Sequence, residues 1–337
     1  MYISYLLSEA KYVSCSRLGE LMNISHDSVN RFLNRENLGH KELFSESKKQ
    51  LELKGGTLSV DDTVLDKLYS YYMSLVGYFW SGKHHCSVKG LNLITLYYTD
   101  IKGNHLPINY RIYDKSEGKT KNDYFLEMLE EVLEWGVKPS FVTGDSWYSG
   151  VQNLKAIRNH QLGFQFGLKS NRRVSVEKNQ FVQIQKLDIP EEGLEVWLRE
   201  FGHVKVFRTM LKNQQRHYAV YLPNNEPLAV FDRKRFIELH DKHWQIEQYH
   251  RVIKQVCHIE HFQVRSQTAI RNHIFSSLCA YVRLQHLRVT DLISNCYSLQ
   301  RNLFNQVIRS FIQSFMPTIE HLDSQFHEPL FSENNLN

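Results

Sequence analysis

The feature that most constrains the fold is a series of apolar, strand-like runs separated by helical periodicities. Residues 87–99 are rich in apolar and β-branched side chains, which predicts a buried strand, and 108–113 predict its hairpin partner beyond a turn containing Gly and Pro. Residues 121–135 carry apolar side chains at helical spacing, and 140–145 return to strand character. Strands followed by helices predict an α/β core.

The rest of the chain divides by its pattern. Residues 163–231 are short alternating segments between polar turns, which predicts a β-rich stretch, and residues 232–315 are predominantly helical. We therefore expect a helical region at 1–50, the first part of the core at 55–162, a β-rich insertion at 163–231, completion of the core at 232–290, and a helical region with a loose tail at 291–337.

Residues 12–35 predict two short helices with a tight connection, and Ser25 is placed to cap the second helix. This pattern is typical of a helix-turn-helix, in which the second helix reads DNA. A plain helical hairpin has a similar pattern, so both interpretations stay open. The side chains that the second helix would offer to DNA are His26, Asp27, Ser28, Asn30 and Arg31.

Composition excludes several classes of protein. A net charge of +5 permits a polyanionic partner without requiring one. The five cysteines are scattered without a CxxC pair, which argues against a zinc ribbon or a disulfide framework and fits a reduced cytoplasmic interior. No apolar run is long enough to predict a membrane span.

Acidic side chains stand where the predicted strands end. Asp61 and Asp62 end one strand, Asp145 ends a second, and Glu247 lies on a predicted helix. Strand ends in α/β folds meet in a shared crevice, and carboxylate ligands without nearby cysteine favour Mg²⁺ or Mn²⁺. Two such ions can activate an attacking hydroxyl and stabilise the leaving oxygen of a phosphodiester. Taken alone, each Asp can equally be a turn former or a helix cap.

The helix around Glu247 strengthens the case for a site. At about 100° per residue, one polar stripe roughly 60° wide contains His240, His243, Glu247 and Lys254. A separate apolar stripe, which can face the core, contains Ile246, Tyr249, Ile253 and Val256. A carboxylate flanked by such cations could hold metal while the cations and Arg251 bind phosphate. An amphipathic helix with paired surface charges is the structural alternative.

The spacing His240-x2-His243-x3-Glu247-x6-Lys254 resembles the Tyr-x2-Arg-x3-Glu-x6-Lys signature of bacterial insertion-sequence transposases of the DDE type. Other segments are similar to motifs of the same family, over about residues 55 to 290. They are Asp61-Asp62-Thr63, GDSWYSG at 144–150, GLKSNR at 167–172, and HFQVRS with its IRNHI at 261–274.

The resemblance implies an RNase H-like catalytic core interrupted by a β-rich insertion. It implies cut-and-paste transposition through a DNA hairpin, with Asp61, Asp145 and Glu247 as the metal-binding catalytic triad for Mg²⁺ or Mn²⁺, with two ions expected. The family's Asp-x-Thr pattern favours Asp61. Asp62 stays an alternative, because a shift of one residue in strand register turns the neighbouring side chain to the site.

The resemblance also assigns DNA contacts, with two departures from the family. Lys254 matches the signature lysine, whereas His240 and His243 replace its Tyr and Arg. Histidine binds phosphate more weakly than a bidentate Arg at neutral pH, so we expect reduced or pH-dependent activity. Hairpin formation needs a flipped base stacked on an aromatic ring, although a buried core role is the alternative for each candidate. The candidates are Trp197, Tyr218 and Tyr221.

The sequence thus predicts a transposase that acts on double-stranded DNA, at terminal inverted repeats and at a target. A homodimer in a synaptic complex and a place at the bacterial nucleoid in the cytoplasm are expected with it. One alternative is a domesticated or inactive relative, or a helix-turn-helix regulator, that only binds DNA. The two histidine replacements favour that alternative. A nuclease that cuts without rejoining is the other.

Overall fold

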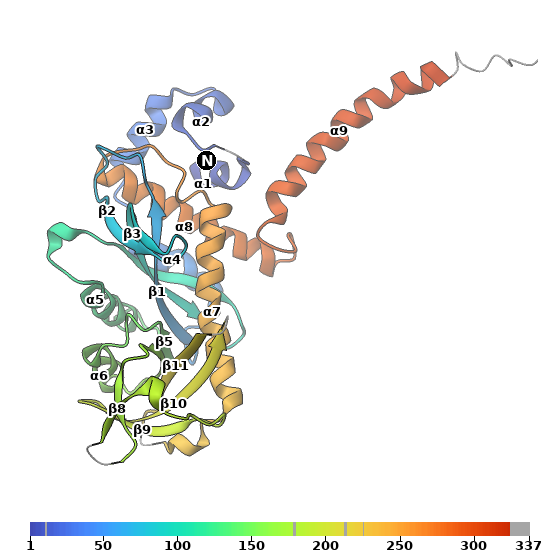
Figure 1. Ribbon diagram of the computed structural model, residues 1–337. Coiled ribbons are helices and arrows are strands. Elements are labelled where there is room, and N and C mark those ends of the chain that lie inside the picture. Colours follow the sequence, from blue (N-terminus) through green and yellow to red (C-terminus); the bar gives the residue numbers. More distant parts are fainter. Residues whose placement is uncertain (11, 178–179, 212–213, 225, 324–337) are drawn as a thin grey trace, which may run out of the picture.

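The computed structural model describes residues 1–323 apart from 11, 178–179, 212–213 and 225, with side chains to residue 314. Its described strands form one mixed sheet of 11 strands in the order β2-β3-β1-β5-β6-β11-β10-β9-β7-β8, with β4 paired to β3 (Figure 1). The strands are β1 (Thr57–Asp66), β2 (Gly77–Ser81), β3 (Cys86–Thr99), β4 (His105–Ile112), β5 (Phe141–Gly144), β6 (Gly163–Leu168), β7 (Arg173–Ser175), β8 (Phe181–Gln183), β9 (Leu194–Leu198), β10 (Gly202–Leu211) and β11 (Gln214–Tyr221).

Helices surround the sheet and extend the chain at both ends (Figure 1). They are α1 (Tyr2–Ser8), α2 (Cys15–Met22), α3 (His26–Arg35), α4 (His40–Ser47), α5 (Lys121–Glu134), α6 (Val151–Asn159), α7 (Arg233–Gln255), α8 (Gln267–Val289) and α9 (Ser298–Asp323). The expected mixed α/β class is confirmed.

Strand pairing brings two distant acidic positions together. Strand β1 pairs antiparallel with β3 and parallel with β5, and Val60 lies opposite Gly144. Asp145 directly follows Gly144, so it leaves the sheet beside Asp61. The sequence predicts the end of the strand before Asp145 correctly, but β1 continues to Asp66, so Asp61 and Asp62 lie within that strand and not at its end. The neighbourhood of Asp61 and Asp145 depends on a pairing between segments more than 80 residues apart.

The β-rich stretch continues the same sheet. Strand β6 pairs parallel with β5, so the first strand of residues 163–231 belongs to the central sheet. Strand β11 pairs with β6, and β10, β9, β7 and β8 follow outward. The segment that the sequence marks as an insertion therefore begins with a strand of the core and then widens the sheet at one edge.

The two faces of the sheet pack against different helices. On one face, Val60 and Ile94 lie in a core with Phe125 of α5 and Leu154 of α6. On the other face, the core joins the sheet to residues of α7 and α8, with Leu65, Leu91, Ile246, Tyr249 and Ile253 among its members. Neighbouring side chains of a strand point to opposite faces. Asp61 therefore faces α7, whereas Asp62 faces α5.

The N-terminal helices form the expected two-helix unit. Ser25 caps α3 by accepting a hydrogen bond from the Asp27 amide, and Asn23 ends α2 in the left-handed conformation with φ of 52°. A Cβ atom on Gly19 would lie 2.7 Å from the Ile24 carbonyl oxygen, so the turn needs a glycine there. Asn272 of α8 donates hydrogen bonds to the carbonyls of Leu33 and Glu36, which fixes the unit to the core.

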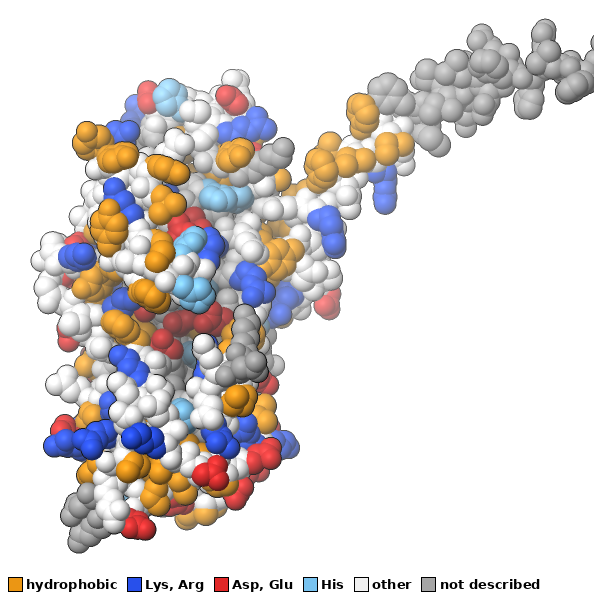
Figure 2. All heavy atoms as spheres, viewed as in Figure 1, with side chains coloured by type: hydrophobic (Ala, Val, Ile, Leu, Met, Phe, Trp, Pro, Cys, Tyr) orange, Lys and Arg blue, Asp and Glu red, His pale blue; other side chains and the backbone are white. Residues whose placement is uncertain are grey.

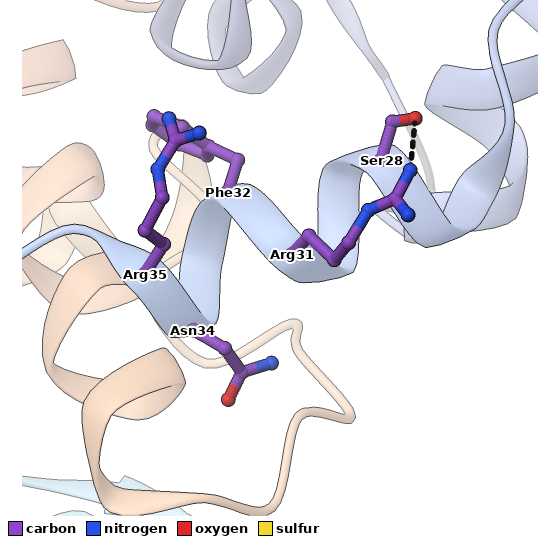
Figure 3. A pocket seen from close by; sticks show the side chains of 5 residues that line it. All are labelled: Ser28, Arg31, Phe32, Asn34 and Arg35. Atoms are coloured by element: carbon purple, nitrogen blue, oxygen red, sulfur yellow. Dashed lines mark hydrogen bonds between the residues drawn. The ribbon is translucent and has the colours of Figure 1, made fainter.

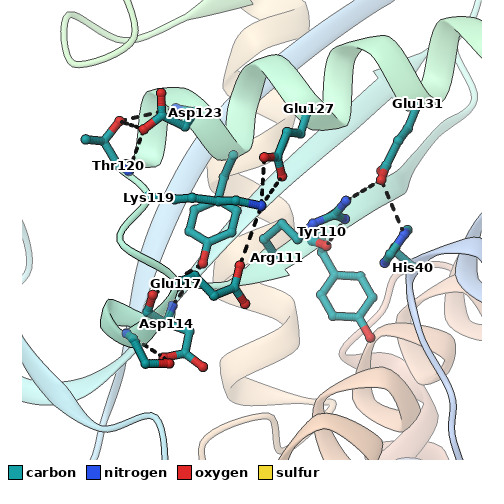
Figure 4. Close-up of polar contacts among 12 residues, drawn as sticks. His40, Tyr110, Arg111, Asp114, Glu117, Lys119, Thr120, Asp123, Glu127 and Glu131 are labelled. Atoms are coloured by element: carbon teal, nitrogen blue, oxygen red, sulfur yellow. Dashed lines mark hydrogen bonds and ion pairs between the residues drawn. The ribbon is translucent and has the colours of Figure 1, made fainter.

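A polar network attaches α4 to the central sheet. Glu131 of α5 accepts a hydrogen bond from Arg111 of β4 at 2.6 Å and lies 3.6 Å from the imidazole of His40 (Figure 4). Lys119, just before α5, pairs with Glu127 at 2.7 Å. These contacts hold the start of α5 in place, and Lys121 stands in that first turn.

Helix α9 projects away from the rest of the molecule (Figure 1). Its described side chains include exposed apolar residues at helical spacing, namely Leu303, Phe304, Val307 and Ile308. Residues 324–337, where the loose tail is expected, lie outside the described part of the chain. Within the described residues, the helices are too short or too polar to span a bilayer.

Candidate active site

Three side chains from β1 and α7 converge on one point. Asp61, Glu247 and His250 each offer a ligand atom, and these atoms lie within 4.8 Å of one another. Glu247 and His250 share one side of α7 because residues three apart are neighbours on a helix. Asp61 is 9% exposed and His250 is 6% exposed, whereas Glu247 is open to solvent. Asp61 and His250 therefore form the buried part of the group, and Glu247 forms its accessible part.

His250 is the member of this group that the sequence reasoning missed. Its Nδ1 lies 3.6 Å from Oδ2 of Asp61, and its buried Nε2 has no hydrogen-bond partner among the described residues. Burial lowers the pKa of His250 to about 3, with a smaller contribution from the charge of Lys254. The ring is thus neutral at physiological pH, and a neutral imidazole can bind a cation through its free nitrogen. The Glu-x2-His spacing in the sequence is the signal that points to it.

Asp62 points away from this group, and its carboxylate is already bound. It accepts hydrogen bonds from Asn92 Nδ2 at 2.6 Å, from Lys121 Nζ at 2.7 Å and from the Tyr148 hydroxyl at 3.0 Å. These partners come from β3, the start of α5 and the segment after β5. Asp62 therefore joins the α5 face of the sheet to the loop that carries Asp145.

Asp145 stands beside the convergent group at the end of β5. Its Oδ1 accepts a hydrogen bond from the Trp147 amide at 2.8 Å, which fixes the direction of the carboxylate. Desolvation raises the pKa of Asp145 to about 6, and the charge of Asp62 adds to the rise. Asp145 lies outside the group whose ligand atoms approach within 4.8 Å, and it acts on Asp61 through its charge.

The carboxylates destabilise one another in their ionised forms. Burial raises the pKa of Asp61 well above its usual range, and the charges of Glu247 and Asp145 raise it further. Burial also raises the pKa of Glu247, while Arg216 and Arg251 oppose that rise. A bound cation would offset this repulsion and favour the ionised carboxylates.

The donor set fits a divalent metal ion. Two carboxylates, a neutral imidazole and a third carboxylate on the adjacent strand supply oxygen and nitrogen ligands without a thiolate. Carboxylate oxygens suit Mg²⁺ and Mn²⁺, and imidazole suits the transition metals. The unpaired His250 Nε2 is a buried polar atom of the kind that a ligand can satisfy. Figure 2 shows the red carboxylates gathered on this face, with histidines next to them.

The two signature histidines are packed against the sheet. His240 Nε2 lies 3.3 Å from the Tyr218 hydroxyl, and His243 Nδ1 lies 3.2 Å from Thr143 Oγ1. Burial lowers the pKa of both rings, that of His243 to about 4. Neither ring carries a positive charge at neutral pH in this setting.

The other two basic candidates of α7 are Lys254, which is hydrogen-bonded, and Arg251, which is exposed. Lys254 donates a hydrogen bond to the Val64 carbonyl at 2.6 Å and pairs with Glu260 at 2.9 Å, so its ammonium is held beside the end of β1. Arg251 is exposed, and its charge lowers the pKa of Glu247. Arg216 of β11, which the sequence reasoning did not single out, has the same effect on Glu247.

The aromatic candidates for base stacking lie in different settings. Tyr218 is 9% exposed and packs edge-on against Phe236, and Tyr221 is stacked on Phe164 at 5.5 Å between ring centroids. Trp197 of β9 is 44% exposed. Trp197 therefore has a ring that an incoming base can reach, whereas Tyr218 fills the core.

A different tryptophan lies at the mouth of the candidate site. Trp147 is 53% exposed, and its ring centroid lies near two ammonium groups, that of Lys121 at 5.3 Å and that of Lys169 at 5.4 Å. It stands two residues after Asp145, within the GDSWYSG segment. The motif pointed to this segment, but only the structure brings the lysines to the ring.

The second helix of the N-terminal unit carries an exposed hollow. Ser28, Arg31, Phe32, Asn34 and Arg35 line this space of about 510 Å³ on α3 (Figure 3). The Arg31 guanidinium donates a hydrogen bond to Ser28 Oγ at 3.2 Å. Of the other candidates from the sequence, His26 and Asp27 are exposed at the start of α3, and Asn30 is half-buried and faces the side of α3 toward Tyr2.

Comparison with known proteins gives a matching family and a set of similar solved structures. The family model described as the transposase DDE domain matches residues 58–283, a range that begins in β1 and ends in α8. The Drosophila P element transposase strand transfer complex is similar at 9% identity and a TM-score of 0.28, over 54% of this chain and 46% of that chain. This chain thus spans about half the length of that structure's chain. No curated protein matches the sequence.

Proposed function

This chain belongs to the transposase DDE domain family, and we propose that it cleaves and joins DNA strands at the ends of an insertion sequence with Asp61, Asp145 and Glu247. The observation that carries this proposal is the convergence of Asp61 and Glu247, which come from β1 and α7, beside the end of β5. Cut-and-paste transposition through a DNA hairpin is the reaction that the family resemblance supports for these residues.

The strand order supports an RNase H-like core. Strands β4, β3, β1, β5 and β6 are adjacent in that order, with β3 antiparallel to its neighbours and β1, β5 and β6 parallel. In this proposal the core ends at β6, and β7 to β11 form the β-rich insertion before α7. The candidate carboxylates then lie on the two central strands and on the helix that covers them.

Between the neighbouring aspartates, the proposal assigns the catalytic role to Asp61. Its carboxylate faces Glu247 and His250, whereas Asp62 is bound by Asn92 and Lys121 on the other face. Asp62 is a positioning residue here, because Lys121 and Tyr148 connect it to the loop of Asp145.

Asp61, Asp145 and Glu247 would hold divalent metal, Mg²⁺ or Mn²⁺ and two ions by family resemblance, with His250 as an additional ligand. Such ions supply Lewis-acid activation of a hydroxyl nucleophile and charge stabilisation at the phosphate. The protein's own contribution is placement: the Trp147 amide orients Asp145. The exposed Arg251, Arg216 and Lys169 surround the carboxylates with positive charge that attracts the DNA backbone.

Contacts outside the core extend the proposal to partners. The exposed hollow of α3, with Ser28 and Arg31, supports binding of the terminal inverted repeats by the helix-turn-helix, and Asn30 would contribute from the side of α3 toward Tyr2. The exposed apolar side chains of α9 support association with a second copy in a synaptic homodimer. Target DNA and a place at the bacterial nucleoid in the cytoplasm belong to the same proposal.

A DNA-binding protein without catalysis is the second candidate. It is favoured by the state of His240 and His243, which are neutral and bonded to Tyr218 and Thr143 where the family signature has Tyr and Arg. Lys254 likewise donates a hydrogen bond to the Val64 carbonyl. In an active enzyme, Arg251 would then be the main phosphate-binding side chain of α7. Trp197 would be the one exposed ring among the three candidates for base stacking.

The test is cleavage of a DNA duplex that carries the flanking element end, with Mg²⁺ or Mn²⁺. Wild type is compared with Glu247→Gln and with the matched control Glu238→Gln, which alters an exposed glutamate on the same helix. Metal-dependent nicking at the end that Glu247→Gln loses and Glu238→Gln keeps would support the proposal. Binding without cleavage in all three proteins would favour the second candidate. Absence of both binding and cleavage would refute both.

A further inference from the structure

The segment that leads into the edge strand β2 exposes an unusual number of aromatic rings. Tyr69, Tyr71 and Tyr72 are 87%, 80% and 82% exposed, and Tyr78 and Trp80 on β2 are 67% and 66% exposed. Five exposed large rings within 12 residues form a surface that water solvates poorly, and such patches mark binding sites. In Figure 2 hydrophobic side chains gather over β2, to one side of the carboxylates.

The register of β2 arranges part of this segment as a flat surface. Tyr78 pairs with Lys89 and Trp80 pairs with Ser87, so these side chains lie on one face of the sheet. Phe79 between them is buried against Tyr113, with ring centroids 5.6 Å apart. The burial of Phe79 therefore fixes Tyr78 and Trp80 outward.

One lysine joins the loop to the strand. Lys89 Nζ lies 4.9 Å from the centre of the Tyr71 ring, which places Tyr71 next to the Tyr78 position. We call the group formed by Tyr71, Tyr78, Trp80 and Lys89 the aromatic platform. It combines three accessible π faces with a cation.

The aromatic platform lies on the face of the sheet that presents Asp61. Asp61 pairs with Thr95 of β3, and Lys89 is six residues away on the same strand. Side chains an even number of residues apart on a strand point to the same face of the sheet. Six residues correspond to about 20 Å along a strand. A DNA strand bound at the carboxylates thus needs to extend by only about six nucleotides to reach the rings.

The charges around the aromatic platform favour a polyanion. Lys83, His84 and Lys89 lie at this edge, and the nearby acid, Asp66, is bound by His84 at 2.8 Å and by Lys83 at 3.4 Å. Aromatic faces interleaved with cations are the arrangement that binds unpaired nucleic acid, because every base has a π face and every nucleotide a negative charge. A protein partner would not require the lysines.

We propose that the aromatic platform stacks on unpaired bases of a DNA strand that extends from the active site. This inference rests on the proposed function for the source of the strand. The stacking itself is independent of metal and of sequence. It assigns the β1–β2 segment to the handling of DNA opened near the cleavage point.

The experiment measures binding of two probes without metal: a blunt duplex of arbitrary sequence, and the same duplex with a single-stranded tail containing 2-aminopurine. The double variant Tyr78→Ala/Trp80→Ala is compared with Tyr78→Phe/Trp80→Phe, which keeps the rings, and with Trp244→Ala, a control that alters a tryptophan 47% exposed on α7. Loss of a stack is expected to weaken binding about tenfold.

We expect the double alanine variant to lose about tenfold in affinity for the tailed probe and nothing for the blunt probe. Phenylalanine should preserve tail binding and the change in 2-aminopurine fluorescence. Equal tail binding by wild type and the alanine variant would overturn the proposal, and so would an equal loss on both probes. A wild type that binds tails normally but never cleaves would refute the proposed function while leaving the aromatic platform supported.

Discussion

The ammonium of Lys121 lies 2.7 Å from Oδ2 of Asp62, on the face of β1 opposite to the one that presents Asp61. Two adjacent carboxylates therefore have different neighbours. Asp62 is bonded to a cation and an amide, whereas Asp61 meets the charges of Glu247 and Asp145, which raise its pKa. The first is a structural ion pair, and the second is a carboxylate that gains by binding metal.

Exchanging each aspartate for asparagine separates these roles. Asp61→Asn should reduce metal-dependent cleavage by at least about a hundredfold and leave the free energy of unfolding near the wild-type value or above it, because a repelled buried charge is removed. Asp62→Asn should lower the free energy of unfolding by about 1–3 kcal/mol, because Lys121 loses its partner. Urea unfolding and a cleavage assay at low temperature measure both. Abolished cleavage with unchanged stability in Asp62→Asn would reverse the assignment.

The role of His250 is tested through metal affinity. One of its ring nitrogens lies in the group with Asp61 and Glu247, so His250→Ala should raise the Mn²⁺ concentration needed for half-maximal cleavage about 10- to 100-fold. Binding of duplex DNA without metal should not change. An unaltered metal requirement together with a loss of stability would instead make His250 a core histidine.

The repulsion among the carboxylates gives a pH-dependent response to metal. The pKa of Asp145 is raised to about 6, so its stabilising contribution is complete below the unfolded value near 4 and is lost as pH rises through about 6. Metal binding offsets this loss. Saturating Mn²⁺ should therefore raise the Tm clearly at pH 8 and little at pH 5, where Asp145 is protonated. Calorimetry with Glu247→Gln, which should show a smaller rise at pH 8, provides the control. Equal metal stabilisation at both pH values would contradict this account.

A buried histidine produces the opposite trend at acid pH. His273 Nδ1 lies 2.7 Å from the Tyr2 hydroxyl and its Nε2 lies 3.1 Å from the His258 carbonyl, and burial lowers the His273 pKa to about 3. The unfolded chain binds a proton near pH 6.5, so stability falls as pH drops below that value, by up to about 1.4 kcal/mol per pH unit for this group. His273→Gln should show a shallower fall in unfolding free energy between pH 7 and pH 5. A slope equal to that of wild type would exclude His273 as a source of acid sensitivity.

The local sequence pattern is sufficient to predict features that depend on a single helix or strand. The apolar stripe predicted for α7 is buried as expected, with Ile246, Tyr249 and Ile253 at 0% exposure, because helical geometry relates these positions directly. The cap of α3 by Ser25 and the strand before Asp145 are local in the same sense.

Contacts between distant segments could not be read from the pattern. Alternation along β1 separates Asp61 from Asp62, but only the packing of α7 and α5 shows which face is which. The same holds for Lys254, whose ammonium bonds the Val64 carbonyl rather than standing free on a polar stripe. The sequence pattern groups β6 with the predicted insertion because β6 resembles the strands that follow it. Its pairing with β5 depends on contacts between distant segments, which a local pattern does not show.

Trp147 offers the most direct probe of DNA at the candidate site. Its exposed ring lies within 5.4 Å of the ammonium groups of Lys121 and Lys169, and its amide orients Asp145, so a nucleotide next to the scissile phosphate would pass this ring. Trp147→Ala removes the ring and keeps the amide. It should therefore lower kcat/KM for element-end cleavage about tenfold, whereas Trp147→Phe should lose less.

Fluorescence separates stacking from a structural role of Trp147. DNA should quench tryptophan emission in the wild type and in Trp244→Phe, a control at an exposed tryptophan on α7, and the quench should shrink in Trp147→Phe. A structural role would lower the Tm of Trp147→Ala and leave the quench of the phenylalanine variant unchanged. If the ring contacts DNA, Trp147→Phe should show a smaller quench and Trp147→Ala should keep the wild-type Tm, since the ring is 53% exposed.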